Sequence, residues 1–364
     1  MSLLPNDYFG WCCTTFNSPS EAEEESRLEI AWRRARVAEQ EKEALAFVAS
    51  KHAKFRSKIG VVSTPQTPSC LSWCGADGTL AIGMSGGQVA FARGPAIASI
   101  ENTLATSGGV SSSQFLYKDS SELFLAGTNE TTVHIFNTSK NTQLAAWRPF
   151  VPAVGQRSPV ITCWNHQLLF TSGNVPFIRA WDLTREHGVF DLATSVNAGV
   201  TAMCDVGGNG LIAGFGSGVV KFFDPREGLD ISKDLAGFTT CAIGLAVPST
   251  SPNSVVAASR DGKVSIWDLR SGSTKQCSPM KTFATKNKSE VSAFALHSVA
   301  PVLACGYLEQ IHLYNLNGEQ LRVIRYHEGF LEERIGPISA LAFHPHKMVV
   351  AAASTDKYVS VWSE

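Results

Sequence analysis

Residues 258–270 read ASRDGKVSIWDLR, and the pattern of this stretch indicates the fold of the chain. Its small residues are followed by a polar turn at Asp261–Gly262, a run of alternating apolar residues, and Trp267 before an Asp. Alternation of apolar and polar residues is typical of a half-buried strand, and an Asp-Gly pair between two such runs is typical of a tight hairpin turn. The stretch therefore predicts two antiparallel strands joined by a short turn.

The same unit occurs seven times along the chain. The other copies are IGMSGGQVAFAR at 82–93, AGTNETTVHIFNT at 126–138, TSGNVPFIRAWDL at 171–183, AGFGSGVVKFFDPR at 213–226, CGYLEQIHLYNLNG at 305–318 and ASTDKYVSVWSE at 353–364. Their aromatic anchors lie 42 to 48 residues apart, at Phe91, Phe136, Trp181, Phe223, Trp267, Tyr314 and Trp362. WD repeats recur at about 40–45 residues and supply four strands to each blade. The spacing therefore predicts an all-β, seven-bladed WD40-type β-propeller.

The propeller is predicted to span residues 54–364. Each copy supplies the second and third strands of a blade, and apolar runs such as ISALAF at 338–343 precede the copies as inner strands. The last copy lies at the end of the sequence, whereas residues 55–62, FRSKIGVV, precede the first blade and lack another partner. Because closed propellers avoid unpaired strand edges, we expect residues 55–62 to complete the seventh blade.

Residues 1–53 are predicted to form a helical leader. Within them, residues 20–52 contain no Pro or Gly and are rich in Glu, Arg, Lys and Ala, which favour helices. Ser20 and Glu23 have the spacing of a capping box. An interrupted apolar stripe at helical spacing indicates one helix that packs on one side, and it consists of Leu28, Trp32, Ala35, Ala38, Leu45 and Val48.

Charge and composition argue against several classes of partner. The 31 Lys and Arg balance 32 Asp and Glu, so no excess of positive charge attracts nucleic acid or an anionic membrane. No stretch has the ~18 consecutive apolar residues of a membrane span. The nine cysteines are scattered and show no CxxC spacing, so we expect reduced thiols. Cys70 with Cys74, and His344 with His346, lack further ligands nearby, so no metal site is expected.

Motifs for catalysis or cofactor binding are not found in the sequence. The glycine-rich stretches at 109–112, 207–210 and 214–218 do not match GxxxxGK[ST], and they fit hairpin turns better than phosphate loops. No GxSxG or similar nucleophile signature occurs. We therefore expect no enzymatic activity, no cofactor and no small-molecule substrate.

Two long loops between blades carry the predicted protein-binding residues. Binding sites concentrate on such loops, and Trp, Tyr and Arg are enriched at interface hot spots. The alternative is that the aromatic residues only fill the rim of the disc, and the sequence favours neither reading. The predicted binding residues are Trp147, Phe150 and Arg157 in one loop, and Tyr326, Phe330, Glu332 and Arg334 in the other.

The segment YHEGFLEERIGPISALAFHPHKMVVAAASTDKYVSVWS, residues 326–363, closely resembles the last blade of the Raptor family. Residues 145–164, 172–186 and 305–326 are similar to other parts of the family's propeller, while blade 1 and residues 228–290 match weakly. The Gly-His pair of strong WD repeats is missing, so the polar set that braces such blades is incomplete. Its surviving parts are Asp261 with Trp267, and Asp356 with Trp362.

The resemblance is to the C-terminal WD-repeat domain of Raptor, the scaffold subunit of TOR complex 1. It implies a non-catalytic scaffold that supports complex assembly, substrate recruitment and nutrient-responsive growth signalling. The implied partners are a TOR-family kinase and its substrates or regulators, and the implied location is the cytoplasm, with recruitment to a lysosomal or vacuolar surface. The alternatives are a WD-repeat adaptor of a ubiquitin ligase or trafficking complex and, more remotely, a propeller enzyme.

Overall fold

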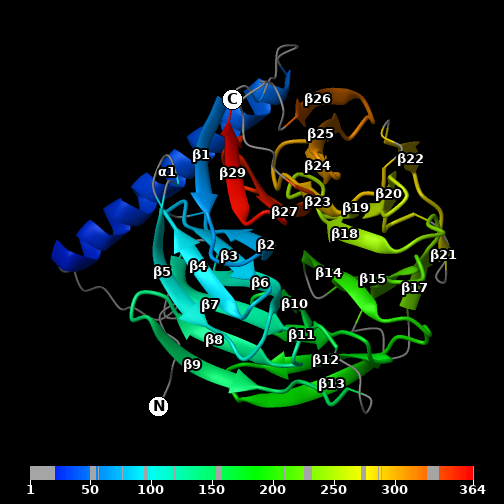
Figure 1. The fold of residues 1–364 in the computed structure, drawn as a ribbon, viewed down its shortest axis with the longest axis horizontal. Helices are drawn as coiled ribbons and strands as arrows, with labels where there is room; N and C mark the ends of the chain where they lie inside the picture. The colour runs from blue at the N-terminus through cyan, green and yellow to red at the C-terminus, as the bar shows by residue number, and fades with distance from the viewer. Residues whose placement is uncertain are drawn as a thin grey trace, which may run out of the picture.

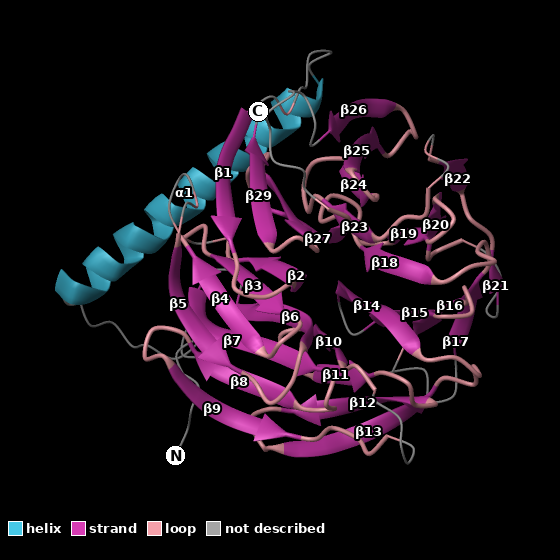
Figure 2. Cartoon of the chain, in the orientation of Figure 1, coloured by secondary structure: helices cyan, strands magenta, loops and turns pink. Residues whose placement is uncertain are grey.

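A computed structural model shows a ring of seven β-sheets with one long helix beside it (Figures 1 and 2). The predicted seven-bladed propeller with a helical N-terminal element is confirmed. The structure describes residues 21–49, 55, 57–75, 77–93, 97, 99–117, 120–152, 158–207, 210–224, 232–271, 276–285, 287, 289–325 and 336–363.

The strands of each blade are given from the inner to the outer edge. Blade 1 consists of β2 (Pro68–Trp73), β3 (Leu80–Met84), β4 (Gln88–Ala92) and β5 (Ile100–Ala105). Blade 2 consists of β6 (Val110–Tyr117), β7 (Ser120–Thr128), β8 (Val133–Asn137) and β9 (Thr142–Trp147). Blade 3 consists of β10 (Ile161–Trp164), β11 (Leu169–Ser172), β12 (Phe177–Asp182) and β13 (His187–Ala193). Blade 4 consists of β14 (Val200–Gly207), β15 (Gly210–Phe215), β16 (Val220–Phe223), β17 (Ser232–Leu235) and β21 (Gln276–Cys277). Blade 5 consists of β18 (Ala242–Ala246), β19 (Ser254–Ser259), β20 (Lys263–Asp268) and β22 (Lys281–Ala284). Blade 6 consists of β23 (Ala293–Leu296), β24 (Val302–Gly306), β25 (Gln310–Asn315) and β26 (Gln320–Arg325). Blade 7 consists of β27 (Ile338–Phe343), β28 (Val350–Ser354), β29 (Tyr358–Ser363) and β1 (Ser57–Ser63).

The repeat that decides the fold forms the hairpin β19–β20. Val255 pairs with Trp267 across it, and Gly262 in the turn has a φ of 83°. An L residue with a side chain is strained at that φ, which explains the Asp-Gly pair at this turn. The other six copies likewise form the second and third strands of their blades.

The seventh blade takes its outer strand from the other end of the chain. β1 pairs antiparallel with β29, with Val62 opposite Val359 and Ser63 opposite Tyr358. Beyond the ladder, the Thr64 N–H donates to the Lys357 carbonyl at 2.8 Å. In Figure 1 the blue strand β1 lies directly beside the red strand β29. The last blade is therefore built from the first and the last three described strands.

Neighbouring blades are linked near the centre of the ring by side-chain hydroxyls that donate to the backbone of the next blade. The Ser69 hydroxyl of blade 1 donates to the Val110 carbonyl of blade 2 at 2.6 Å. The Ser339 hydroxyl of blade 7 donates to the Pro68 carbonyl of blade 1 at 2.7 Å. Because both ends of the second bond lie at the closure of the ring, it joins the last blade to the first.

Some second strands contain a glycine where the next blade approaches. A Cβ on Gly306 of β24 would lie 2.7 Å from Cγ2 of Ile338 on β27, and a Cβ on Gly127 of β7 would lie 2.7 Å from the Val160 carbonyl oxygen. Such distances are far below van der Waals contact. The small residue before the turn in these copies of the repeat is therefore required for close packing between blades.

Blade 4 departs from the predicted four strands. After β20 the chain runs to β21, which pairs parallel with the outer strand β17, with Leu235 opposite Cys277. The Ala236 N–H also donates to the Cys277 carbonyl at 3.1 Å. Leu235 and Cys277 are both buried, so this detour covers apolar surface between blades 4 and 5 before β22 completes blade 5.

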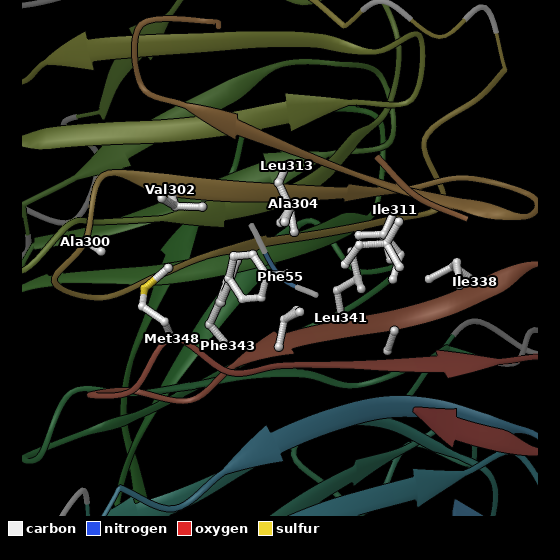
Figure 3. Close-up of a cluster of buried hydrophobic side chains, with 14 of the residues drawn as sticks. Phe55, Ala300, Val302, Ala304, Ile311, Leu313, Ile338, Leu341, Phe343 and Met348 are labelled. Carbon is white, nitrogen blue, oxygen red and sulfur yellow. The ribbon is translucent and has the colours of Figure 1, made fainter. Parts of the chain in front are cut away.

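The apolar core is divided into clusters between neighbouring blades. One cluster lies between blades 6 and 7 and includes Phe343, Met348 and Phe55, which precedes β1 (Figure 3). The ring centroids of Phe55 and Phe343 are 6.4 Å apart. Because burial of a Phe side chain contributes about 1.5–3 kcal/mol, Phe55 is a strong anchor of the N-terminal segment on the ring.

The helix α1 (Glu21–Ala49) packs on the ring through a different face from the predicted one. Trp32, Ala35, Ala38 and Leu45 of the apolar stripe are exposed, and Trp32 is 61% exposed. The buried contact is made by Ala44, which joins the cluster around Phe343 and Met348. The helix was thus predicted correctly, but the expected packing of its apolar stripe is not seen for the four members whose side chains are described; the side chains of Leu28 and Val48 lie outside the described part. No helix of the described chain is long and apolar enough to cross a membrane.

Candidate protein-binding surface

Of the seven predicted binding residues, the structure describes Trp147 and Phe150. The other five, which are Arg157, Tyr326, Phe330, Glu332 and Arg334, lie outside the described residues. The geometry therefore bears on the loop that follows β9, where the chain passes from blade 2 to blade 3.

Trp147 ends β9 and is half-buried against blade 3. Its ring lies 5.7 Å from that of Trp181 in an edge-to-face arrangement. Trp181, the aromatic anchor of blade 3, donates its indole N–H to the Thr171 hydroxyl at 3.2 Å. Successive side chains of β9 point to opposite faces of the sheet, and Trp147 lies on the face that is turned toward blade 3.

Phe150 is buried, and it attaches the loop to β12. Its ring meets that of Phe177 edge to face, with the centroids 6.4 Å apart. The adjacent Pro149 carbonyl accepts a hydrogen bond from Arg179 Nη1 at 3.0 Å. Phe150 therefore holds the loop in place in this structure and contributes no exposed surface to it.

Arg179 connects this loop to the outer strand of blade 3. Its Nε and Nη2 donate to the two carboxylate oxygens of Asp191, each at 2.7 Å, and its guanidinium lies 5.0 Å from the Phe177 ring. The hydrogen bonds from Arg179 to Asp191 raise the pKa of the guanidinium above its usual value. Bidentate pairing fixes the plane of the guanidinium, which then presents Nη1 to the loop.

The exposed apolar residue of this loop is Val151. It follows the buried Phe150 and is 86% exposed. A valine so exposed beside a fixed loop is available for contact with another molecule. Sequence reasoning missed Val151 because it selected large aromatic and charged residues, and the two of these that the structure describes, Trp147 and Phe150, pack against blade 3.

The thiols with resolved shifts are unsuited to nucleophilic chemistry. Burial raises the pKa of the Cys70 thiol to about 11 and that of Cys305 to about 12. A thiol must be ionised to attack or to bind a metal, so these groups are inert near neutral pH. Within the described ranges no group of three or more His, Cys, Asp or Glu could hold a metal ion.

Two buried histidines act as turn caps after inner strands. His297 Nδ1 accepts the N–H groups of Val299 at 3.2 Å and Ala300 at 2.9 Å, and its Nε2 lies 3.1 Å from the Lys347 carbonyl oxygen. His344 Nδ1 likewise accepts N–H groups from the residues two and three positions later, both at 3.1 Å. Burial, the largest cause, lowers the pKa of His297 to about 4 and that of His344 to about 3. These histidines serve the loops and stay neutral.

The surviving Asp and Trp residues of the WD polar set form hydrogen bonds with other partners in this structure. In blade 5 the Ser259 hydroxyl donates to the Asp261 carboxylate, but the Trp267 indole donates to the Ala236 carbonyl at 3.0 Å. In blade 7 the Trp362 indole donates to the Ser360 hydroxyl at 3.0 Å. The Trp267 and Trp362 indoles are therefore bonded to different kinds of partner, a carbonyl beside the outer strand of blade 4 and a hydroxyl within blade 7.

Comparison with known proteins adds family information to this geometry. The family model described as "WD domain, G-beta repeat" matches residues 319–363, from the end of blade 6 to the end of blade 7. The protein raptor homolog of Dictyostelium discoideum is 27% identical over 99% of this chain, and the chain covers 26% of its length. Regulatory-associated protein of TOR 1 of Arabidopsis thaliana is 33% identical over 55% of the chain, and the chain covers 15% of its length.

A further relative and a solved structure point to the same family. Target of rapamycin complex 1 subunit mip1 of Schizosaccharomyces pombe is 26% identical over 74% of the chain, which covers 21% of it. The crystal structure of Chaetomium thermophilum Raptor superimposes with a TM-score of 0.73 and 22% identity over 85% of this chain and 29% of that one, which shows the shared fold. The chain thus spans about a quarter or less of the length of these relatives. The resemblance predicted from the sequence is confirmed, because the homologues of this chain are Raptor proteins and its propeller has the fold of a Raptor structure.

Proposed function

We propose that this chain is a non-catalytic scaffold propeller of a TOR kinase complex. The observation that carries the proposal is the 27% identity to a raptor homolog over 99% of the chain. The similarity to a subunit named for target of rapamycin complex 1 supports the same assignment. Because the chain spans only a part of these relatives, their complete activities are assigned to it only within this proposal.

In the proposed role the ring supplies a rigid surface and the kinase supplies the chemistry. Blade-to-blade hydroxyl bonds and the shared seventh blade keep the loops in fixed positions. Fixed loops bind with a small loss of conformational entropy, which suits complex assembly and substrate recruitment. The proposal includes responses to nutrients in the cytoplasm and at lysosomal or vacuolar surfaces.

Recovery of the partner from cells tests this function. The tagged chain is expressed in cells, crosslinked, purified and probed for a TOR kinase, with an unrelated tagged WD propeller as the control. We expect the kinase to be enriched over the control. A folded chain that recovers no kinase after crosslinking contradicts the proposal, and recovery of ubiquitin ligase or coat subunits instead supports an adaptor of another complex.

The loop after β9 supplies a sharper version of the same experiment. Val151→Glu adds a charge at an exposed position, and Val189→Glu makes the same change at a half-exposed position of the β13 edge. If the loop contacts the partner, Val151→Glu lowers kinase recovery several-fold while Val189→Glu does not, since charge at the core of an interface is costly. Equal recovery with both variants removes the loop from the proposed interface.

A further inference from the structure

Among the side chains of α1 that the structure describes, those that contact the ring lie in the C-terminal half of the helix. Ala44 is buried among residues of blades 6 and 7, and His346 Nδ1 lies 2.9 Å from Glu41 Oε1. By contrast, every side chain from 29 to 36 is exposed. Figure 1 shows the helix extending past the edge of the ring toward its N-terminal end. This free part of α1 gains no stability from packing against the rest of the described chain.

The free part of α1 carries large apolar side chains. Trp32 is 61% exposed and Ile30 is 47% exposed, and Leu45 beyond them is 42% exposed. The Arg36 guanidinium lies 5.4 Å from the Trp32 ring, and Arg33 pairs with Glu29 at 2.6 Å. An isolated helix that is open on all sides is only marginally stable in water, and Trp with Arg is a frequent combination at interface hot spots.

The charges of α1 are divided into blocks along the helix. Residues 21–25, EAEEE, carry four Glu, while residues 33–36, RRAR, carry three Arg. The whole helix has eight Glu against four Arg and one Lys, a net charge of −3. Anionic membranes attract helices with a positive net charge, so a lipid surface is the wrong occupant for this helix. A complementary partner must instead present a basic block and an acidic block in the opposite order.

A second copy of α1 has that order when it runs antiparallel. The acidic block is centred near residue 23 and the basic block near residue 34, so a two-fold axis near residue 29 places each acidic block beside the basic block of the other copy. The same register places the exposed Ile30 opposite position 28 of the second helix, which is Leu28. A two-fold pair makes each favourable contact twice, which is how isologous interfaces are built.

We propose that α1 is a self-association element, in which its free part pairs antiparallel with α1 of a second copy of this chain. The side chains of residues 29–36, on the C-terminal side of the proposed axis, are all exposed, so this part of the helix is accessible. Because the surface of a single helix is small, the association is weak, with a Kd of about 10–100 µM. The inference goes beyond the proposed scaffold function and does not depend on it.

Sedimentation equilibrium of the complete chain up to about 200 µM tests the proposal. We expect a monomer–dimer equilibrium that weakens as salt is added, because exposed charge pairs are screened. Two charge-reversed variants, Glu23→Arg/Glu24→Arg/Glu25→Arg and Arg33→Glu/Arg34→Glu/Arg36→Glu, should each weaken self-association at least about tenfold. A mixture of the two variants should form a heterodimer again, because its blocks are complementary.

Controls separate this interface from a general effect of charge. The variant Lys140→Glu/Arg185→Glu/Arg260→Glu makes the same change in net charge as Arg33→Glu/Arg34→Glu/Arg36→Glu, but at exposed positions of the ring, and it should dimerise normally. Circular dichroism and the melting temperature establish that each variant retains the ring. The proposal is overturned if the unaltered chain is monomeric throughout, if the control variant is affected equally, or if the mixture of reversed variants stays monomeric.

Discussion

Two neighbouring segments of the chain, β1 and α1, are attached to the ring in very different ways. β1 completes a blade through a backbone ladder and buries Val62. α1 touches the ring through Ala44 and the Glu41–His346 contact, and every side chain from 29 to 36 is exposed. Attachment therefore weakens along the chain from β1 toward the N-terminal end. The closing strand therefore belongs to the folding unit, whereas the helix is an appendage of it.

Removal of the closing strand should have the largest effect. Deleting residues 54–63 leaves β29 with an unpaired edge, and Val62→Asp places an unpaired carboxylate in the core. The substitution should cost at least about 3 kcal/mol and lower the melting temperature by roughly 6 °C or more. Calorimetry checks this, with Ser63→Asp at the exposed neighbouring position as the control. An unchanged melting temperature for Val62→Asp refutes closure by β1.

The residue between the two segments should give an intermediate effect. Phe55 fills the cluster between blades 6 and 7 beside Phe343. Phe55→Ala should destabilise the ring by about 3 kcal/mol through lost burial and the cavity that remains, as measured by the urea midpoint. Phe190→Ala on the half-buried outer strand of blade 3 should cost clearly less. Equal losses would show that Phe55 is not an anchor of the N-terminal segment.

The stability of blades 6 and 7, which α1 contacts, should depend on pH. His297 and His344 have folded-state pKa values near 4 and 3, below the ordinary value of 6.5, so the unfolded chain binds more protons between these values. Stability is then complete above about pH 6.5 and falls as the pH decreases toward 4. Protonation of Nδ1 would also break the two N–H bonds that each ring accepts. Urea unfolding at pH 7 and pH 5 measures this loss.

Blade 3 supplies the control for that pH dependence. After its inner strand, Asn165 Oδ1 accepts the N–H groups of Gln167 at 3.0 Å and Leu168 at 2.7 Å, the same positions that the histidines cap. Asn does not titrate in this range. The double variant His297→Asn/His344→Asn should therefore keep the turns and reduce the difference in stability between pH 7 and pH 5, while His312, whose pKa burial lowers to about 4, contributes a remainder. An undiminished difference assigns the acid sensitivity to other groups.

The fold could be predicted from the sequence because the repeat contains its own evidence. A hairpin turn such as Asp261–Gly262 and an anchor such as Trp267 are local features, and their recurrence gives the number of blades. Inner strands such as 338–343 were equally readable from alternation. The fifth strand of blade 4 was not, because the two residues Gln276–Cys277 pair with a strand of another blade and leave no periodic pattern.

The binding surface was less predictable because residue type does not reveal direction. Phe150 and Val151 are neighbours, yet the larger residue is buried and the smaller one is exposed. The sequence of α1 shows an apolar stripe with equal clarity, but it does not say whether the stripe contacts the ring or another molecule. These choices depend on contacts between residues far apart in the chain, such as that of Glu41 with His346.

The smallest effect is expected where α1 meets the ring. Glu41→Gln removes the charge from the contact with His346 while retaining an oxygen at the same position. Because Glu41 is about one-third exposed, the loss should be only about 0.5 kcal/mol and the melting temperature should change by roughly 1–2 °C at most. The change should instead be local, as faster hydrogen exchange near the C-terminal end of α1 than in the ring strands.

Glu39→Gln makes the same substitution at an exposed position two residues away and should alter neither the exchange near the end of the helix nor the melting temperature. If Glu41→Gln lowers the melting temperature as much as Phe55→Ala does, α1 belongs to the same cooperative unit as β1. The distinction between closing strand and appendage then fails. If only the exchange of α1 responds, the helix can detach while the ring stays closed, and its free part is held by whatever it binds.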